Sequence, residues 1–206
     1  MRIITISREF GSGGRELGKR LADQLGFDYY DSEIISAVAK NSGMNAGYVE
    51  AVLNDHSWQE YPITYRGTFG SPMYLQSGKV NLLLEQKRVM EGIAARGKDC
   101  VIVGRNADVI LQQYQPFSLF VCADLQSKVK RCRERAPEGE NLTEKELIRK
   151  IRQIDKARAQ TREILSGSPW GQREAYHLTV NTTGWQIKEL VTAVAAFAEC
   201  WFGRIT

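Results

Sequence analysis

The sequence predicts a single α/β domain of three layers, with a five-stranded parallel sheet covered by helices on both faces. Five short β-branched or aromatic runs alternate with helix-like segments, and a glycine-rich stretch directly follows the first run. Strands buried on both faces read as continuous apolar runs, and alternation with helices implies parallel pairing through crossovers. The 206 residues, 43% of them hydrophobic, are enough for one full core.

The expected strands are residues 2–6, 27–31, 100–104, 117–121 and 177–181. Leucines at every fourth position from Leu17 to Leu25 predict a first helix that ends at Gly26. A second helix is expected over 80–96. Near the C-terminus one apolar stripe predicts a packing face, and its members are Ile187, Leu190, Val191, Val194, Phe197 and Trp201.

Two segments depart from this alternation. Residues 41–78 are irregular and rich in Gly, Ser, Asn, Tyr and Pro, and residues 125–170 are charged helices with breaks at APEGEN and SGSPWG. We interpret them as two flaps over the carboxyl ends of the strands, where open α/β sheets bind ligands. The core would then comprise residues 1–40, 79–124 and 171–206 of one domain, 1–206.

Composition limits the environment and the partners. The sequence has no secretory leader or membrane-length apolar run, and its four scattered cysteines lack metal spacing, so we expect a cytoplasmic protein with reduced thiols and no zinc. Residues 126–163 hold twelve Lys/Arg and seven Asp/Glu, a surplus that suits an anionic ligand or a solvated helix pair. This segment lacks the interleaved aromatic residues that are typical of nucleic-acid-binding proteins, so we expect no nucleic-acid partner. The sequence leaves open whether the protein forms a homodimer.

The stretch ISREFGSGGRELGKRL (6–21) predicts a phosphate-binding loop between a strand and a helix. Gly11, Gly13 and Gly14 allow positive φ and close approach, so backbone amides around Ser12 converge on an anion. The alternative is a tight turn without a ligand. Neither standard pattern fits: GxGxxG meets Glu16 at its third glycine, although Asp31 could be its acidic partner. In the pattern GxxxxGK[ST], Arg8 stands in place of the first glycine and Gly14 in place of the lysine.

Three blocks together resemble one family. IITISREFGSGGRELGKRLADQLGFDYYDSEII, CVIVGRNADVIL (100–111) and DKARAQTREILSGSPWGQREAYHLTVNTTG (155–184) are similar to cytidylate kinase-like proteins, relatives of bacterial cytidylate kinase within the nucleoside monophosphate kinases. The resemblance implies a P-loop NTPase fold with a monophosphate-binding flap (41–78) and a helical lid (125–170). It further implies transfer of the γ-phosphoryl of ATP to a nucleoside monophosphate, with CMP or dCMP first, and Mg²⁺.

The overlay leaves the role of the loop lysine unassigned, because Gly14 falls on it. Arg15 is the nearest replacement, with Arg8 and Lys19 behind it, since phosphoryl transfer needs cations on the phosphate oxygens. Glu16 falls on the Mg²⁺-binding Ser/Thr, and a carboxylate can also hold this ion. The alternative for Arg15 and Glu16 is ordinary polarity of a first helical turn. The ATP phosphates would be bound by Arg8, Gly11, Ser12, Gly13, Gly14, Arg15 and Glu16.

The resemblance also assigns an acceptor site and a lid. Asp31, Ser32, Arg105 and Asp155 match acceptor-binding positions, although Asp31 or Ser32 would equally cap the next helix. The catalytic cations would be Arg15, Arg131, Arg158 and Arg162, and Arg135 and Lys156 are further candidates in the lid. The alternative for the lid residues is an exposed helix with surface salt bridges. Trp170, Thr182 and Thr183 would frame the adenine. His56 and His177 receive no chemical role.

Three other functions remain open from the sequence. The same core could phosphorylate another hydroxyl or phosphate acceptor, because residues 41–78 match the family least. Loss of the lysine and the hydroxyl would suit a nucleotide-binding module without turnover. A dinucleotide-binding oxidoreductase is the last, and Glu16 and the basic lid argue against it.

Overall fold

The computed structural model describes residues 1–47, 72–136 and 142–205. The chain divides into two compact units, Met1–Asp31 with Arg96–Thr206 and Ser32–Ala95. The first unit holds the sheet and the glycine-rich loop. Within the described ranges, no helix is long and apolar enough to cross a lipid bilayer.

The first unit is built on a parallel sheet in the order β2-β3-β1-β4-β5. Its strands are β1 (Ile3–Arg8), β2 (Asp28–Tyr30), β3 (Cys100–Val103), β4 (Phe117–Cys122) and β5 (Leu178–Asn181). All four pairings are parallel, which confirms the predicted sheet. Because β1 lies between β3 and β4, the segment that follows it lies beside the carboxyl ends of both neighbours. Ligands bind at this edge in open α/β sheets.

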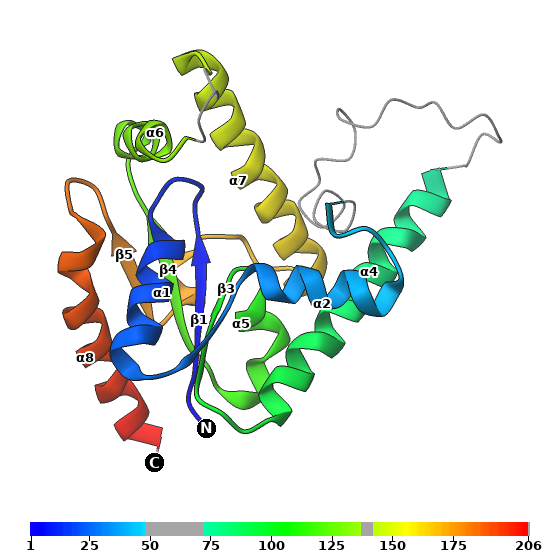
Figure 1. Ribbon diagram of the computed structural model, residues 1–206, viewed down its shortest axis with the longest axis horizontal. Coiled ribbons are helices and arrows are strands. Elements are labelled where there is room, and N and C mark those ends of the chain that lie inside the picture. Colours follow the sequence, from blue (N-terminus) through cyan, green and yellow to red (C-terminus); the bar gives the residue numbers. More distant parts are fainter. Residues whose placement is uncertain (48–71, 137–141, 206) are drawn as a thin grey trace. The chain divides into compact units, whose positions relative to one another are not determined.

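Helices cover this sheet (Figure 1). They are α1 (Gly14–Leu25), α5 (Ala107–Ile110), α6 (Leu125–Glu134), α7 (Glu144–Ser166) and α8 (Ile187–Ile205), with 3-10 turns at Gln112–Tyr114 and Arg173–Ala175. α1 packs along α8. α1 ends at Gly26, as the sequence predicts. α7 begins with a capping box between Thr143 and Glu146, which satisfies its first amides and fixes where the helix starts.

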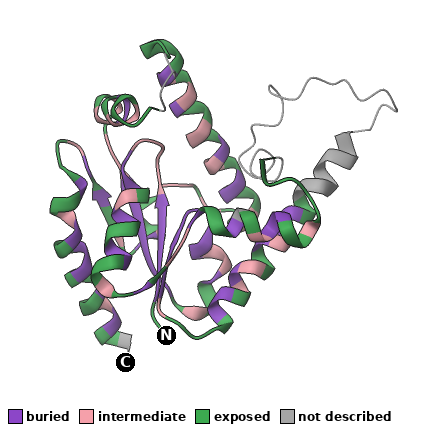
Figure 2. Ribbon diagram, in the orientation of Figure 1, coloured by how far each residue is buried: buried purple, intermediate pink, exposed green. Residues whose placement is uncertain are grey.

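The main core lies between α1, α8 and the sheet (purple in Figure 2). Leu17 and Leu21 of α1 and Val191 of α8 are buried there, as the leucine spacing and the C-terminal stripe predict. Phe197 departs from that stripe because its side chain is largely exposed at the edge of the core. It still stacks on the buried ring of Phe117, with the ring centroids 5.7 Å apart.

The second unit pairs α2 (Ser32–Ser42) with α4 (Pro72–Ala95). The Asn41 amide donates a hydrogen bond to Glu85 Oε1 over 2.8 Å, which joins the two helices. The helix expected over 80–96 begins earlier, at Pro72, so residues 72–78 are helical where an irregular segment was expected. The rest of the proposed acceptor flap, residues 48–71 with His56, lies outside the described residues.

Candidate phosphate-binding site

The glycine-rich loop connects β1 to α1 through two left-handed glycines. Gly11 has φ +77° and Gly13 has φ +85°, values at which a side chain is strained. Ser12 is buried between them, and its hydroxyl donates to the Glu9 carbonyl over 2.8 Å. The next amides belong to the first turn of α1, which has no partners for them within the helix. This end of the helix is therefore suited to an anion.

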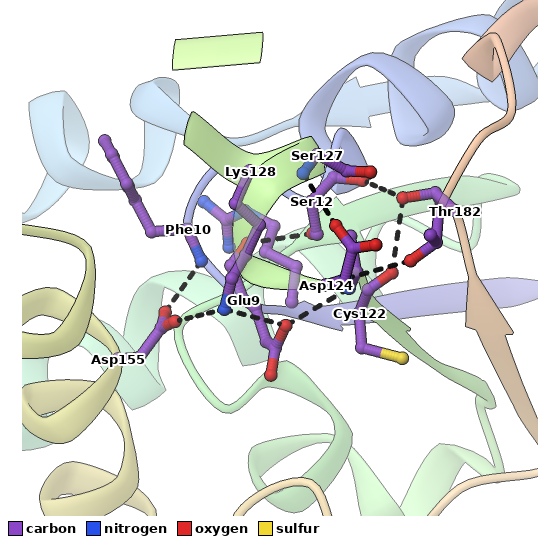
Figure 3. A network of polar contacts seen from close by, with 12 residues as sticks. Glu9, Phe10, Ser12, Cys122, Asp124, Ser127, Lys128, Asp155 and Thr182 are labelled. Atoms are coloured by element: carbon purple, nitrogen blue, oxygen red, sulfur yellow. Dashed lines mark hydrogen bonds and ion pairs between the residues drawn. The ribbon is translucent and has the colours of Figure 1, made fainter. Parts of the chain in front are cut away.

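Helices α6 and α7 both contact the loop (Figure 3). The Phe10 amide donates to Asp155 Oδ1 over 2.7 Å, so α7 binds the loop backbone. Lys128 Nζ on α6 lies 3.1 Å from Glu9 Oε2 and 3.4 Å from Asp155 Oδ2. The Ala123 amide donates to the same Glu9 oxygen over 3.2 Å. Glu9, Lys128 and Asp155 thus connect the loop to both α6 and α7.

Thr182 and Arg131 hold the loop at the Ser12 carbonyl. The Thr182 hydroxyl, which follows β5, donates to that carbonyl over 2.7 Å. Arg131 Nη1 on α6 donates to Thr182 Oγ1 over 3.0 Å and to the Ser12 carbonyl over 3.5 Å, and its Nη2 donates to the Trp185 carbonyl over 3.1 Å. Arg131 is therefore engaged with backbone carbonyls of the loop and of the turn after β5.

A cluster of arginines surrounds the buried carboxylate of Asp31, directly after β2. Arg8 Nη2 lies 3.4 Å from Asp31 Oδ1, and Arg15 Nε pairs with the other carboxylate oxygen. Arg158 of α7 donates to the Arg8 carbonyl over 2.8 Å. Arg105 lies close enough to affect the pKa values of both Arg8 and Arg158. The structure thus brings together Arg8, Arg15, Arg105 and Arg158, which we call the arginine cluster.

The arginine cluster has more positive than negative charge. Burial, and then the charge of Arg158, lowers the pKa of Arg8 to about 9, while Asp31 opposes this shift. Burial lowers the pKa of Arg158 to about 10, opposed by Asp155 and assisted by Arg105 and Arg15. Guanidinium groups normally titrate above pH 12, so the lowered pKa values of Arg8 and Arg158 show that burial and mutual repulsion disfavour their charged forms. A bound anion would relieve both costs.

Arg105 occupies an unusual backbone turn at the end of β3. Gly104, Arg105 and Asn106 have φ values of 78°, 60° and 53°, three consecutive residues in the left-handed region. Two of them carry side chains, and such conformations cost free energy that the surrounding structure must offset. The Ala107 amide closes the turn on the Gly104 carbonyl over 3.2 Å. Strain at a strand end that faces the ligand side points to a positioned Arg105 side chain.

Arg162 lies apart from the arginine cluster. It pairs with Asp108 in an ion pair in which both side chains are at most 5% exposed, and it lies over the Tyr176 ring. In this conformation Arg162 joins α7 to α5 and does not face the loop. The role of a catalytic cation, expected from the sequence, stays a prediction.

Glu16 and Ser32 also have surroundings that the sequence does not reveal. Glu16 pairs with Arg20 on α1 and with Arg135 on α6, and these partners lower the pKa of its carboxyl against the opposing effect of burial. Ser32 begins α2 and belongs to the second unit. Of the residues expected near adenine, Trp170 packs edge-on against Phe120, with the centroids 5.3 Å apart.

The described residues contain no group of three or more potential metal ligands. Mg²⁺ in kinases is commonly held by one or two carboxylates together with substrate phosphates and water, so a preformed protein cage is not required. Glu16 lies in the first turn of α1, where its carboxylate pairs with Arg20 and Arg135. Its expected role as a Mg²⁺ ligand stays a prediction.

Sequence reasoning did not select Glu9, Lys128 or Asp108. Glu9 received no role from the sequence, and Lys128 was one of the twelve Lys/Arg of residues 126–163. Asp108 carries the clearest signal, because it is an acidic residue within the otherwise uncharged stretch ADVIL. Buried charges of this kind are almost always paired, which would have predicted a cationic partner.

Comparisons with known proteins agree with this geometry. No curated protein matches the chain. An uncharacterized protein from Eubacterium ventriosum is similar in structure, with a TM-score of 0.68 and 22% identity, over 97% of this chain and 99% of that one. A shikimate kinase from Bacteroides thetaiotaomicron has a TM-score of 0.57 and 14% identity, over 96% and 98%. A sugar kinase from Janibacter sp. has a TM-score of 0.53 and 11% identity, over 97% and 95%.

These structural similarities establish the fold, which is the three-layer P-loop NTPase fold with a five-stranded parallel sheet. The family comparison matches residues 3–184 to the cytidylate kinase-like family. That match includes the glycine-rich loop, the turn at Arg105 and helices α6 and α7, and it supports a phosphotransferase that binds a nucleotide. On this evidence the chain belongs to the cytidylate kinase-like family.

Proposed function

We propose that the protein transfers the γ-phosphoryl group of ATP to a nucleoside monophosphate, with CMP or dCMP as the first acceptors to test. Kinases of this fold use ATP with Mg²⁺ in general. Family membership supports the nucleotide, and the arginine cluster supports an acceptor that itself carries a phosphate. A cytoplasmic location is part of the same proposal.

The arginine cluster is the observation that carries the proposal. It joins the end of β1, the start of α1, the end of β3 and the lid helix α7 around Asp31. The transferred phosphoryl group spreads charge over its equatorial oxygens and passes between donor and acceptor oxygens. The largely buried guanidinium groups of Arg8 and Arg158 would stabilise that charge with little reorganisation during the reaction. Arg105 would hold the acceptor phosphate, and Arg158 would approach from the lid.

Asp31 favours a second candidate, a kinase of an uncharged hydroxyl. Its carboxylate follows β2 directly, at the carboxyl end of the sheet, where a bound alcohol could donate its proton to a general base. Two structural neighbours are described as a shikimate kinase and a sugar kinase. In the first proposal Asp31 orients Arg8 and Arg15, and in the second it contacts the acceptor.

One assay distinguishes these functions. The protein is incubated with ATP and Mg²⁺ and, separately, with nucleoside monophosphates, shikimate or simple sugars, and ADP is followed against a blank without acceptor. Phosphorylated CMP or dCMP supports the proposal, and ADP formed only with a hydroxyl acceptor supports the second candidate. ATP binding with no ADP from any acceptor supports a module without turnover. A thermal shift with NADH but not with ATP would indicate an oxidoreductase.

A further inference from the structure

Two glycines leave room for the side chain of Arg8. A Cβ atom added at Gly14 would lie 2.7 Å from Arg8 Cβ and 3.2 Å from Arg8 Cδ. A Cβ atom added at Gly104 would lie 2.0 Å from Arg8 Nη1. Arg8 is only 11% exposed, so its side chain has little space to move aside. These two positions, 90 residues apart in the sequence, therefore depend on one arginine.

Gly14 is needed for space rather than for backbone conformation. It is the first residue of α1 and is not among the glycines with positive φ, so its backbone would accept another residue. Glycine is also the poorest non-proline residue for a helix, which gives no local reason to keep it there. The nearest obstacle to a side chain is Arg8 itself, followed by Val121 Cβ at 3.3 Å.

The positions of Arg8 and Gly14 correspond to the two ends of the pattern GxxxxGK. In that pattern the first position is glycine and the seventh is lysine, whose amine reaches the β and γ phosphates. Here the first position is Arg8 and the seventh is Gly14, while the intervening Gly13 is retained. The cationic residue therefore stands at the first position of the pattern and the glycine at the seventh, the reverse of the usual order.

We propose that Arg8 supplies the positive charge that a loop lysine would give to the terminal phosphates of ATP. Positions 14 and 104 are then glycine because a side chain at either would occupy the space of the Arg8 side chain. The guanidinium lies over Gly104, between the loop and the end of β3, and Asp31 holds one of its nitrogens. Two of its nitrogens can bind two phosphate oxygens, which an ammonium group cannot do. Arg15, expected first from the sequence, is 66% exposed and much less fixed.

The inference rests on the proposed use of ATP, so its test measures nucleotide binding without any acceptor. The full chain is titrated with ATP and with AMP by calorimetry, in four forms: wild type, Arg8→Gly, Gly14→Lys and the double variant. The double variant restores GxxxxGK, and with Arg8 gone its lysine needs only a small shift from Val121. Each single change should weaken ATP binding at least about tenfold and AMP binding much less, since AMP lacks the terminal phosphates. The double variant should regain most of the loss.

Arg2→Met is the matched control, because Arg2 lies at the other end of the same strand region and also pairs with an acidic residue, Asp99. It should bind ATP as the wild type does. If Arg8→Gly does not fold, Gly14→Ala carries the test, because it keeps every charge and its new Cβ would lie closest to Arg8, at 2.7 Å, and 3.3 Å from Val121 Cβ. It too should weaken ATP binding more than AMP binding.

Three results would overturn the inference: a wild type that binds ATP no better than AMP, a foldable Arg8→Gly chain within twofold of wild type for ATP, or a double variant no better than the weaker single variant. These results are separate from those that test the proposed function. A chain that forms no ADP with any acceptor ends the proposed function but leaves this comparison intact. A chain that phosphorylates CMP while Arg8→Gly binds ATP normally ends only the inference.

Discussion

Replacing Arg162 with methionine tests whether its buried ion pair fixes α7 to α5. The guanidinium pairs with Asp108, and the two side chains are 4% and 5% exposed. Arg162 Nε also donates to Ser168 Oγ over 3.3 Å. In Arg162→Met the Asp108 carboxylate would keep only the Ser7 hydroxyl, 3.4 Å away, as a hydrogen-bond donor among the described contacts.

The expected loss follows from the burial of this pair. Removing one partner of a buried ion pair costs about 3–5 kcal/mol, because the other charge is left without compensation. For a chain of this size that corresponds to a fall in Tm of about 6–20 °C. Asp108→Asn together with Arg162→Met removes both charges and should cost clearly less than Arg162→Met alone.

Urea denaturation followed by circular dichroism measures the free energy of unfolding of the wild type and of each variant. Arg2→Met is the control, since the Arg2–Asp99 pair is 45% and 29% exposed and its loss should cost less than about 1 kcal/mol. An Arg162→Met chain as stable as Arg2→Met would refute the reasoning. So would a double variant that loses as much as the two single variants combined, because the charges would then not be coupled.

The remaining predictions concern the loop, the end of β3 and pH. Arg105→Ala should raise the KM for the acceptor at least about tenfold and leave the ATP affinity nearly unchanged, because the guanidinium would contact only the acceptor phosphate. Steady-state kinetics measure the first quantity and ATP titration the second. Equal losses in both would contradict this role. Gly11→Ala should lower stability by about 1–2 kcal/mol or more in urea and weaken ATP binding, since φ is +77° and the new Cβ would lie 2.9 Å from Cys132 Sγ. Burial lowers the pKa of His177 below 6.5, and its Nδ1 accepts the Ser118 amide, so the folded state favours neutral imidazole. The unfolded chain therefore binds more protons as the pH falls through about 6.5, and stability should fall on acidification. Urea midpoints at about pH 8 and about pH 5.5 should differ less in His177→Gln than in the wild type, and an unchanged difference would exclude His177 as the cause.

Much of the fold could be predicted from local pattern. The runs beginning at Ile3, Cys100 and Phe117 are continuous and apolar because both faces of their strands are buried, and the structure places strands there. Leu17 and Leu21 predicted α1 in the same way. The helix expected over 80–96 was predicted to start too late, because its turns from Pro72 onward have no apolar spacing that distinguishes them from a loop.

The site was predicted less completely, because side-chain partners come from distant parts of the chain. Sequence position placed Arg8 and Arg105 at strand ends, and the structure brings them together. It could not show that Arg162 turns toward Asp108, since one residue of difference along α7 changes which face of the helix a side chain occupies. It also could not reveal that Gly14 and Gly104 meet the same arginine, because that requires the spatial arrangement of the loop and β3.

The continuity of α7 has a mechanical consequence. Asp155, which holds the Phe10 amide, and Arg162, which holds Asp108, lie on one unbroken helix and are separated by about 10 Å of rise. Arg158 lies between these two anchors on the same helix, so its place is fixed relative to both the loop and α5.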